Sequence, residues 1–141
     1  MIVGPAYDKD IFPSGRLVKD IMTTTKVLND LYMGYVDVRD VARAHLLAIK
    51  VDAAKNRRFL LSGRCAWRSE MAECLANHFN PQGWSISTEE NKEEKPFSYE
   101  VNTTASRAVL GLTYIPIEQS WIDMANCLIE SGQIEKPESE A

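Results

Sequence analysis

The apolar positions between residues 35 and 51 change period partway along the segment. Tyr35, Val36 and Val38 form a short apolar strand, and the residues that follow repeat with the period of a helix. On a helical wheel the apolar side chains fall on one stripe, away from Arg43 and Lys50; they are Val41, Ala44, Leu47, Ala48 and Val51. The pattern predicts a strand that leads directly into an amphipathic helix, one face of which lies on a sheet.

Asp37 and Asp40 stand near the expected start of this helix. A short carboxylate there can accept a hydrogen bond from a free backbone N–H and lies at the positive end of the helix dipole. We therefore interpret Asp37 and Asp40 as helix caps, with Arg39 in an ion pair that links the strand end to the helix start. A ligand site at the same three residues is the alternative.

Similar patterns predict four further elements. A helix from Ser69 to Phe79 places an apolar side chain at every fourth position, which is typical of a core face. Asn102 is expected to cap a helix that runs through Leu110 and stops at Gly111. A last helix begins after Pro116 and ends at Gly132, and the residues it should turn inward are Trp121, Met124, Ala125, Leu128 and Ile129. The segment 84–87 alternates like a strand.

Two regions are expected to be less regular. Residues 11–34 indicate a loop and a short helix, in which Phe12-Pro-Ser-Gly15 is a turn signal and Leu17-Val18-Ile21-Met22 is a small apolar stripe. The charged segment 89–95 has no apolar period and is interpreted as a surface loop.

Composition and charge exclude several classes. The 141 residues are 45% hydrophobic and 26% charged, which is ordinary for a globular domain with a real core. The net charge of −4 gives no footprint for nucleic acid or an anionic membrane, and no apolar run approaches the roughly 20 residues of a membrane span. We expect a cytoplasmic protein with no nucleic-acid and no membrane partner.

The cysteines and histidines do not assemble a recognisable site. Cys65, Cys74 and Cys127 form no C-x-x-C pair, and with only His45 and His78 besides them no zinc spacing is possible. We expect no metal site and three reduced thiols. Cys74 and His78 share a helix face, but they have no third orienting group, so a core cysteine beside a surface histidine is favoured over a nucleophile pair.

Several motifs, in order, resemble one enzyme family. They are Val3-Gly-Pro-Ala-Tyr-Asp-Lys-Asp10, Tyr35-Val-Asp-Val-Arg-Asp-Val-Ala-Arg-Ala-His45, Arg58-Phe-Leu-Leu-Ser-Gly63, the segment 69–79, Asn102-Thr-Thr-Ala-Ser-Arg-Ala-Val-Leu-Gly111 and the segment 117–134. Together they resemble the C-terminal, substrate-side part of extended short-chain dehydrogenase/reductases in the NAD-dependent epimerase/dehydratase superfamily. The nearest branch is that of dihydroflavonol, cinnamoyl-CoA and methylglyoxal or ketone reductases.

The resemblance implies an α/β fold: the C-terminal portion of an extended Rossmann-type reductase, with short parallel strands and about four to five helices. Residues 1–134 would form this substrate-side portion, an incomplete domain, and residues 135–141 a frayed polar tail. Residues 58–63 would be a sheet strand.

Two family motifs do not occur in this chain. None of its seven glycines forms GxGxxG or GxxGxxG, and no tyrosine is followed four places on by lysine. The nucleotide-binding half is therefore missing, and we assign no catalytic residue. By resemblance, Val3, Gly4 and Pro5 would form the wall beside the cofactor, NADP or NAD in the complete enzyme. The region 11–34 would lie over the substrate and set specificity, and the segment 8–22 would cover the pocket.

Three functional hypotheses follow. The chain is the substrate-side part of a reductase of small ketones, aldehydes or flavonoid-like carbonyls, inactive and without bound cofactor when alone. It would then self-associate or require a chain that carries the nucleotide-binding half. Alternatively it is a non-catalytic interaction module, or the product of a truncated or split gene. The substrate and the choice between NADP and NAD stay open.

Overall fold

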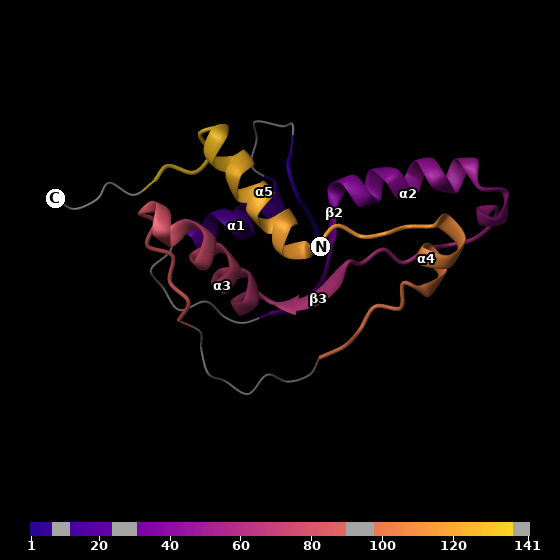
Figure 1. Cartoon of the computed structure of the whole chain (residues 1–141), viewed down its shortest axis with the longest axis horizontal. Helices are drawn as coiled ribbons and strands as arrows, with labels where there is room; N and C mark the ends of the chain where they lie inside the picture. Colours follow the sequence, from indigo (N-terminus) through magenta and orange to yellow (C-terminus); the bar gives the residue numbers. More distant parts are fainter. Residues whose placement is uncertain (7–11, 24–30, 90–97, 137–141) are drawn as a thin grey trace.

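The computed structural model describes residues 1–6, 12–23, 31–89 and 98–136, and it has the expected α/β fold. A three-stranded sheet lies between two groups of helices. The strands are β1 (Ile2–Val3), β2 (Tyr32–Asp37) and β3 (Arg64–Trp67), with β2 and β3 labelled in Figure 1. The helices are α1 (Pro13–Thr23), α2 (Val38–Lys50), α3 (Arg68–Phe79), α4 (Thr104–Leu110) and α5 (Ile117–Glu130), with 3₁₀ turns at Asp52–Ala54 and Asn80–Gln82.

The sheet has the order β1-β2-β3. β1 runs parallel to β2, with Ile2 opposite Val36, whereas β3 runs antiparallel to β2, with Tyr32 opposite Trp67. β2 therefore begins at Tyr32, three residues earlier than the apolar pattern indicates, because Tyr32–Gly34 pair with β3. It ends at Asp37, and α2 follows at Val38 without a connecting loop.

The prediction of a strand at residues 58–63 is wrong. The pairing with β2 starts only at Gly63, whose N–H donates to the carbonyl of Tyr35 at 2.7 Å. Residues 58–62 are extended but join no ladder in the described part of the chain. Phe59 and Leu61 instead pack by their side chains against the apolar cluster between α2 and α4.

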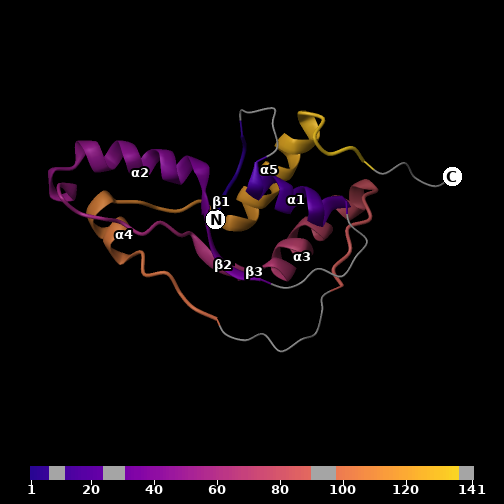
Figure 2. The ribbon, with the colours of Figure 1, turned by 180° about the vertical axis from the view of Figure 1, so that it is seen from behind.

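The core is divided into two clusters. The larger lies between the sheet and the helices α1, α3 and α5, which stand together on one side in both views (Figures 1 and 2). The smaller lies between α2, α4 and the turn at Asp52–Ala54, and its buried members are Ala44, Ala54, Leu110 and Leu112. The first cluster carries most of the buried apolar volume, so it is the main source of stability.

Most of the expected helices are confirmed. Met71, Leu75 and Phe79 of α3 are fully buried, as their four-residue spacing indicates. The N-cap of α4 is Thr103 and not Asn102, but Asn102 Oδ1 accepts the N–H of Thr104 at 3.0 Å from one residue earlier. As expected, Gly111 closes α4 in the left-handed conformation with φ 66°.

α5 buries four of the five expected side chains, and Ile129 is half-buried.

Two local expectations fail for identifiable reasons. Residues 13–15 form the first turn of α1 and not an isolated turn, because proline is well tolerated at the first helical position. Residues 84–87 form no strand, although Trp84 and Ile86 are buried in alternation. The Asn80 side chain binds both the N–H and the carbonyl of Ile86, and thus takes the place of a neighbouring strand. The segment 89–95, apart from Glu89, and the tail beyond residue 136 lie outside the described residues.

Candidate functional site

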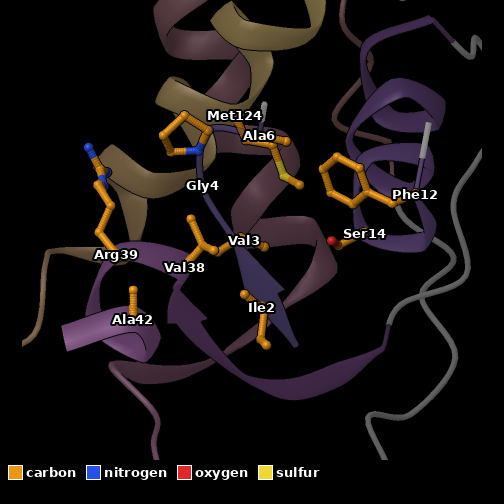
Figure 3. A pocket seen from close by; sticks show the side chains of 11 residues that line it. Ile2, Val3, Gly4, Ala6, Phe12, Ser14, Val38, Arg39, Ala42 and Met124 are labelled. Atoms are coloured by element: carbon orange, nitrogen blue, oxygen red, sulfur yellow. The ribbon is translucent and has the colours of Figure 1, made fainter. Parts of the chain in front are cut away.

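An apolar cavity of about 510 Å³ opens at the carboxyl ends of β1 and β2. Figure 3 shows its walls: β1 and the residues after it, the start of α2, the start of α1, and one side chain from α5. The lining residues are Ile2, Val3, Gly4, Pro5, Ala6, Phe12, Ser14, Val38, Arg39, Ala42 and Met124. Only Ser14 and Arg39 bring polar side chains to this lining.

Gly4 fixes the close contact between β1 and the start of α2. Its φ of 115° is in the region that favours glycine. A Cβ atom on Gly4 would lie 3.1 Å from Asp37 Oδ2 and 3.2 Å from Val38 Cγ1. Both the conformation and the space therefore require glycine here, and the backbone at Gly4 forms the cavity wall.

Asp37 is buried behind this wall and is the N-cap of α2. Its carboxylate accepts the N–H of Arg39 at 2.8 Å, as the sequence pattern predicts. The Arg39 side chain also donates to both carboxylate oxygens, at 2.8 and 2.7 Å, and reaches Asp123 of α5 at 2.7 Å. The expected ion pair between Asp37 and Arg39 is confirmed, and it extends to a third residue that is distant in sequence.

The surroundings of Asp37 act on its pKa in opposite directions. Burial alone would raise the pKa, but hydrogen bonds from the Arg39 side chain, the Ser120 side chain and the Arg39 N–H outweigh it. The pKa of Asp37 is therefore below its ordinary value, while the same ion pairs raise the pKa of Arg39. Asp37 stays ionised at neutral pH and serves as a fixed structural anion.

The capping role expected for Asp40 is wrong. Asp40 is 1% exposed, and its Oδ2 accepts the N–H of Ile115 at 2.8 Å, while Oδ1 pairs with Arg43 at 3.2 Å. Asp40 therefore ties α2 to the segment that precedes α5. No sequence spacing indicates a contact between residues 75 positions apart.

The three residues assigned from sequence to the cofactor wall, Val3, Gly4 and Pro5, all line the cavity. Their role toward a cofactor stays a prediction. Phe12 and Ser14 lie within the segment 8–22 that the resemblance assigns to the substrate cover, although the pattern Phe12-Pro-Ser-Gly15 indicated a turn. The structure makes this stretch the start of α1, since proline is common at the first position of a helix. Sequence reasoning missed Met124 as part of the lining, because it was assigned to the core face of the last helix.

No cysteine or histidine is among the described residues that line this cavity, although the Cys127 thiol donates to the carbonyl of the lining residue Ala6 at 3.0 Å. Cys74 lies on α3, where its thiol faces the carbonyl of Glu118 at 3.9 Å, and burial raises its pKa, which disfavours the reactive thiolate. His78 packs edge-on against Phe79, with ring centroids 4.7 Å apart. All three thiols are free, and the described residues contain no cluster of three metal-ligating side chains. In the same part of the chain, every helix is too short or too polar to cross a bilayer.

Comparison with known proteins identifies similar sequences and folds. No family model matches the chain. It is 32% identical over 141 residues to cinnamoyl-CoA reductase 2 of Arabidopsis thaliana, a match that covers 98% of this chain and 41% of the relative. It is 31% identical over 137 residues to cinnamoyl-CoA reductase 1 of the same plant, covering 95% of this chain and 39% of the relative.

Two solved structures share the fold. Gre2 from Candida albicans superposes with a TM-score of 0.79 at 25% identity, over 94% of this chain and 43% of that one. The yeast methylglyoxal/isovaleraldehyde reductase Gre2, complexed with NADPH, superposes with a TM-score of 0.76 at 20% identity, over 94% of this chain and 44% of that one. The chain spans less than half the length of each of these proteins.

Proposed function

Because the chain belongs to the extended short-chain dehydrogenase/reductase superfamily, we propose that it forms the substrate-side part of an NADP-dependent reductase of small carbonyl compounds. The observation that carries this proposal is the apolar cavity beyond the carboxyl ends of β1 and β2. In open α/β sheets, ligands bind in the crevice at this end of the parallel strands.

Within this proposal, Val3, Gly4 and Pro5 form the wall nearest the cofactor. Because Gly4 has no side chain, its main chain packs directly on Asp37 and Val38, and this close packing fixes the position of the wall. When bound, NADP would supply the hydride. The residues of this chain would orient the carbonyl compound and exclude water. NADP is favoured over NAD because the related yeast reductase was crystallised with NADPH.

The pyrophosphate cradle and the proton donor must come from elsewhere. The chain has no Gly-rich turn and no Tyr-x-x-x-Lys, so a second polypeptide segment has to supply both. Its docking surface would be the free edge of β1 and the outer face of α2. On that face Leu46 is 58% and Ile49 is 85% exposed, and on β1 Ile2, which lies near the start of α2, is 49% exposed. We place this assembly in the cytoplasm.

Fusion to a relative's missing part tests the proposal. The segment of Arabidopsis cinnamoyl-CoA reductase 2 that precedes the matched region is joined to this chain, and NADPH oxidation is followed with a panel of aldehydes and ketones. The chain alone should oxidise no NADPH, because positioning and proton transfer each contribute several orders of magnitude to the rate. The fusion should bind NADPH and reduce at least one carbonyl compound.

Two glycine variants of the fusion serve as a matched pair. Gly4→Ala places a Cβ against Asp37 and should lower NADPH affinity at least tenfold, whereas Gly111→Ala, with nothing within 4 Å of its Cβ, should leave it unchanged. The backbone strain is larger at Gly4, with φ 115°, than at Gly111, whose φ of 66° lies in the left-handed helical region, so the fold of each variant is first established by circular dichroism. A folded fusion that binds no NADPH, or equal effects of the two variants, would contradict the proposal.

A non-catalytic interaction module is the second candidate. The observation in its favour is that α1, α3 and α5 already enclose a complete core around Trp121 without any further segment. A chain that is monomeric, binds no hydrophobic dye and unfolds sharply, together with an inactive but folded fusion, would favour this candidate over the reductase.

A further inference from the structure

The walls of the cavity define the kind of ligand that it can hold. Phe12 contributes an aromatic ring, Met124 a flexible thioether chain that is 1% exposed, and Val3 an aliphatic floor. Figure 3 shows these side chains arranged around one open space, with the ring of Phe12 pointing into it. A surface of this kind favours a planar or branched hydrocarbon body, because its gain comes from removing apolar area from water.

Ser14 is the uncommitted polar group of this lining. It is the second residue of α1, and its hydroxyl points into the open space (Figure 3). Within the described part of the chain this hydroxyl makes no hydrogen bond, although the side chain is half-buried. A hydroxyl in that position can donate to one oxygen of a ligand.

The charges beside the cavity disfavour an anion. Arg39 is the cationic residue among the described lining residues, and its guanidinium already serves the carboxylates of Asp37 and Asp123. Its positive charge is therefore already balanced, so a phosphate or carboxylate group finds no free cation among the described lining residues, whereas a neutral oxygen needs none.

We propose that Ser14 is a specificity-determining residue that donates a hydrogen bond to the oxygen of a neutral, largely apolar ketone or aldehyde whose hydrocarbon body lies against Phe12 and Met124. This inference rests on the proposed function for its biological meaning, since it names the substrate class of the same cavity. It selects neutral aryl and alkyl carbonyl compounds over sugar nucleotides and acids.

Three probes of similar shape separate the contributions of apolar contact, hydrogen bonding and charge to binding. Acetophenone carries the ketone oxygen, α-methylstyrene replaces that oxygen by a methylene group, and benzoate adds a negative charge. Each is titrated into the whole chain without cofactor, and dissociation constants are taken from the amide chemical shifts of Ser14, Gly15 and Val38. Acetophenone should bind about three- to tenfold more tightly than α-methylstyrene, the range that one hydrogen bond provides. Benzoate should bind more weakly than acetophenone.

Variants of Ser14 assign the difference to its hydroxyl. Ser14→Ala should remove the preference for acetophenone and leave the affinity for α-methylstyrene unchanged, while Ser14→Thr should retain the preference. Ser85→Ala, at an exposed serine outside the cavity, is the control and should change neither. Far-ultraviolet circular dichroism establishes that each variant is folded.

Several results would overturn the inference: no binding of acetophenone, equal binding of the two neutral probes, tighter binding of benzoate, or an unchanged preference in Ser14→Ala. Because these titrations use the chain without NADPH, they leave the reductase proposal standing, which the fusion tests separately. Conversely, an inactive fusion does not alter the measured preference of the cavity.

Discussion

The two helical groups of this molecule differ in how far their apolar side chains are buried. Around α5 the apolar side chains are covered, and Trp121 at the centre is 0% exposed against Tyr35, with ring centroids 5.3 Å apart. On α2 only Asp40 and Ala44 are buried, while Leu46 and Ile49 face outward. The apolar face of α5 is therefore covered, whereas α2, a helix with a similar number of apolar residues, leaves part of its apolar surface exposed.

The uncovered residues of α2 are regularly placed. Val38, Ala42, Leu46 and Ile49 are all exposed, and their spacing of four, four and three residues puts them on one face of the helix. The opposite stripe, with Ala44, packs on the small cluster near α4. Contiguous exposed apolar surface in a soluble domain marks an interaction site. The comparison teaches that α2, unlike α5, has an apolar face that no described part of this chain covers, and under the reductase proposal this face would contact the partner segment.

The largest effect on stability is expected in the helical group around α5, where the apolar side chains are covered. Trp121→Ala should lower the free energy of unfolding by about 3–5 kcal/mol, because it removes a fully buried indole and leaves a cavity between α5 and β2. Urea denaturation followed by circular dichroism measures the change. Leu46→Ala on α2 is the matched control and should change the free energy by about 0.5 kcal/mol or less. Equal losses at the two positions would remove the distinction between the two sides.

Asp37, at the junction between the two sides, should give an intermediate effect that depends on pH. Asp37→Asn removes charge-assisted hydrogen bonds to Arg39, each worth about 1.5–3 kcal/mol in general. Since the folded pKa of Asp37 lies below the ordinary aspartate pKa, the stabilisation is complete above that ordinary pKa and is lost as the pH falls through the folded pKa.

Unfolding free energies measured from pH 7 down to pH 2 test this sign. The unmodified chain should lose its advantage over Asp37→Asn below about pH 4, near the ordinary aspartate pKa. A difference between the two proteins that stays constant over this range would show that Asp37 does not contribute through its charge.

The smallest effect on stability is expected at the exposed apolar face of α2, where we expect a large effect on association. Leu46→Glu combined with Ile49→Glu should change the free energy of unfolding by about 0.5 kcal/mol or less, since both side chains face solvent. The double variant should sediment as a monomer and bind less hydrophobic dye than the unmodified chain. Lys55→Glu, at an exposed polar position, is the control for added negative charge. A monomeric unmodified chain without dye binding would show that the α2 face is not an association surface.

The sequence predicts best where its signal is local. The four-residue spacing of Met71, Leu75 and Phe79, and glycine as the stop of α4, depend only on neighbours along the chain, and both are confirmed. The α/β fold and the family follow from the order of motifs and are confirmed by the relatives.

The rest depends on contacts that tertiary structure creates. Residues 58–62 have the composition of a strand, but they pair with no strand in the described part of the chain. The main chain of Ile86 is hydrogen-bonded by the Asn80 side chain and not by a neighbouring strand. Asp40 binds the main chain of Ile115, and Ser14 reaches the cavity only because α1 begins at Pro13. For the same reason the cavity itself, assembled from four separate elements, has no signature in any one segment.

The position of β1 at the end of the sheet has a consequence for symmetry. Within the described residues β1 pairs on one side only, with β2. Two identical chains that joined β1 to β1 would be related by a two-fold axis, so these strands would run antiparallel and each chain would have used that edge. Such a pair would be closed and would not grow into a filament through this contact. Under the reductase proposal, a partner strand would need the same edge, so the pair of identical chains and the mixed complex would exclude each other.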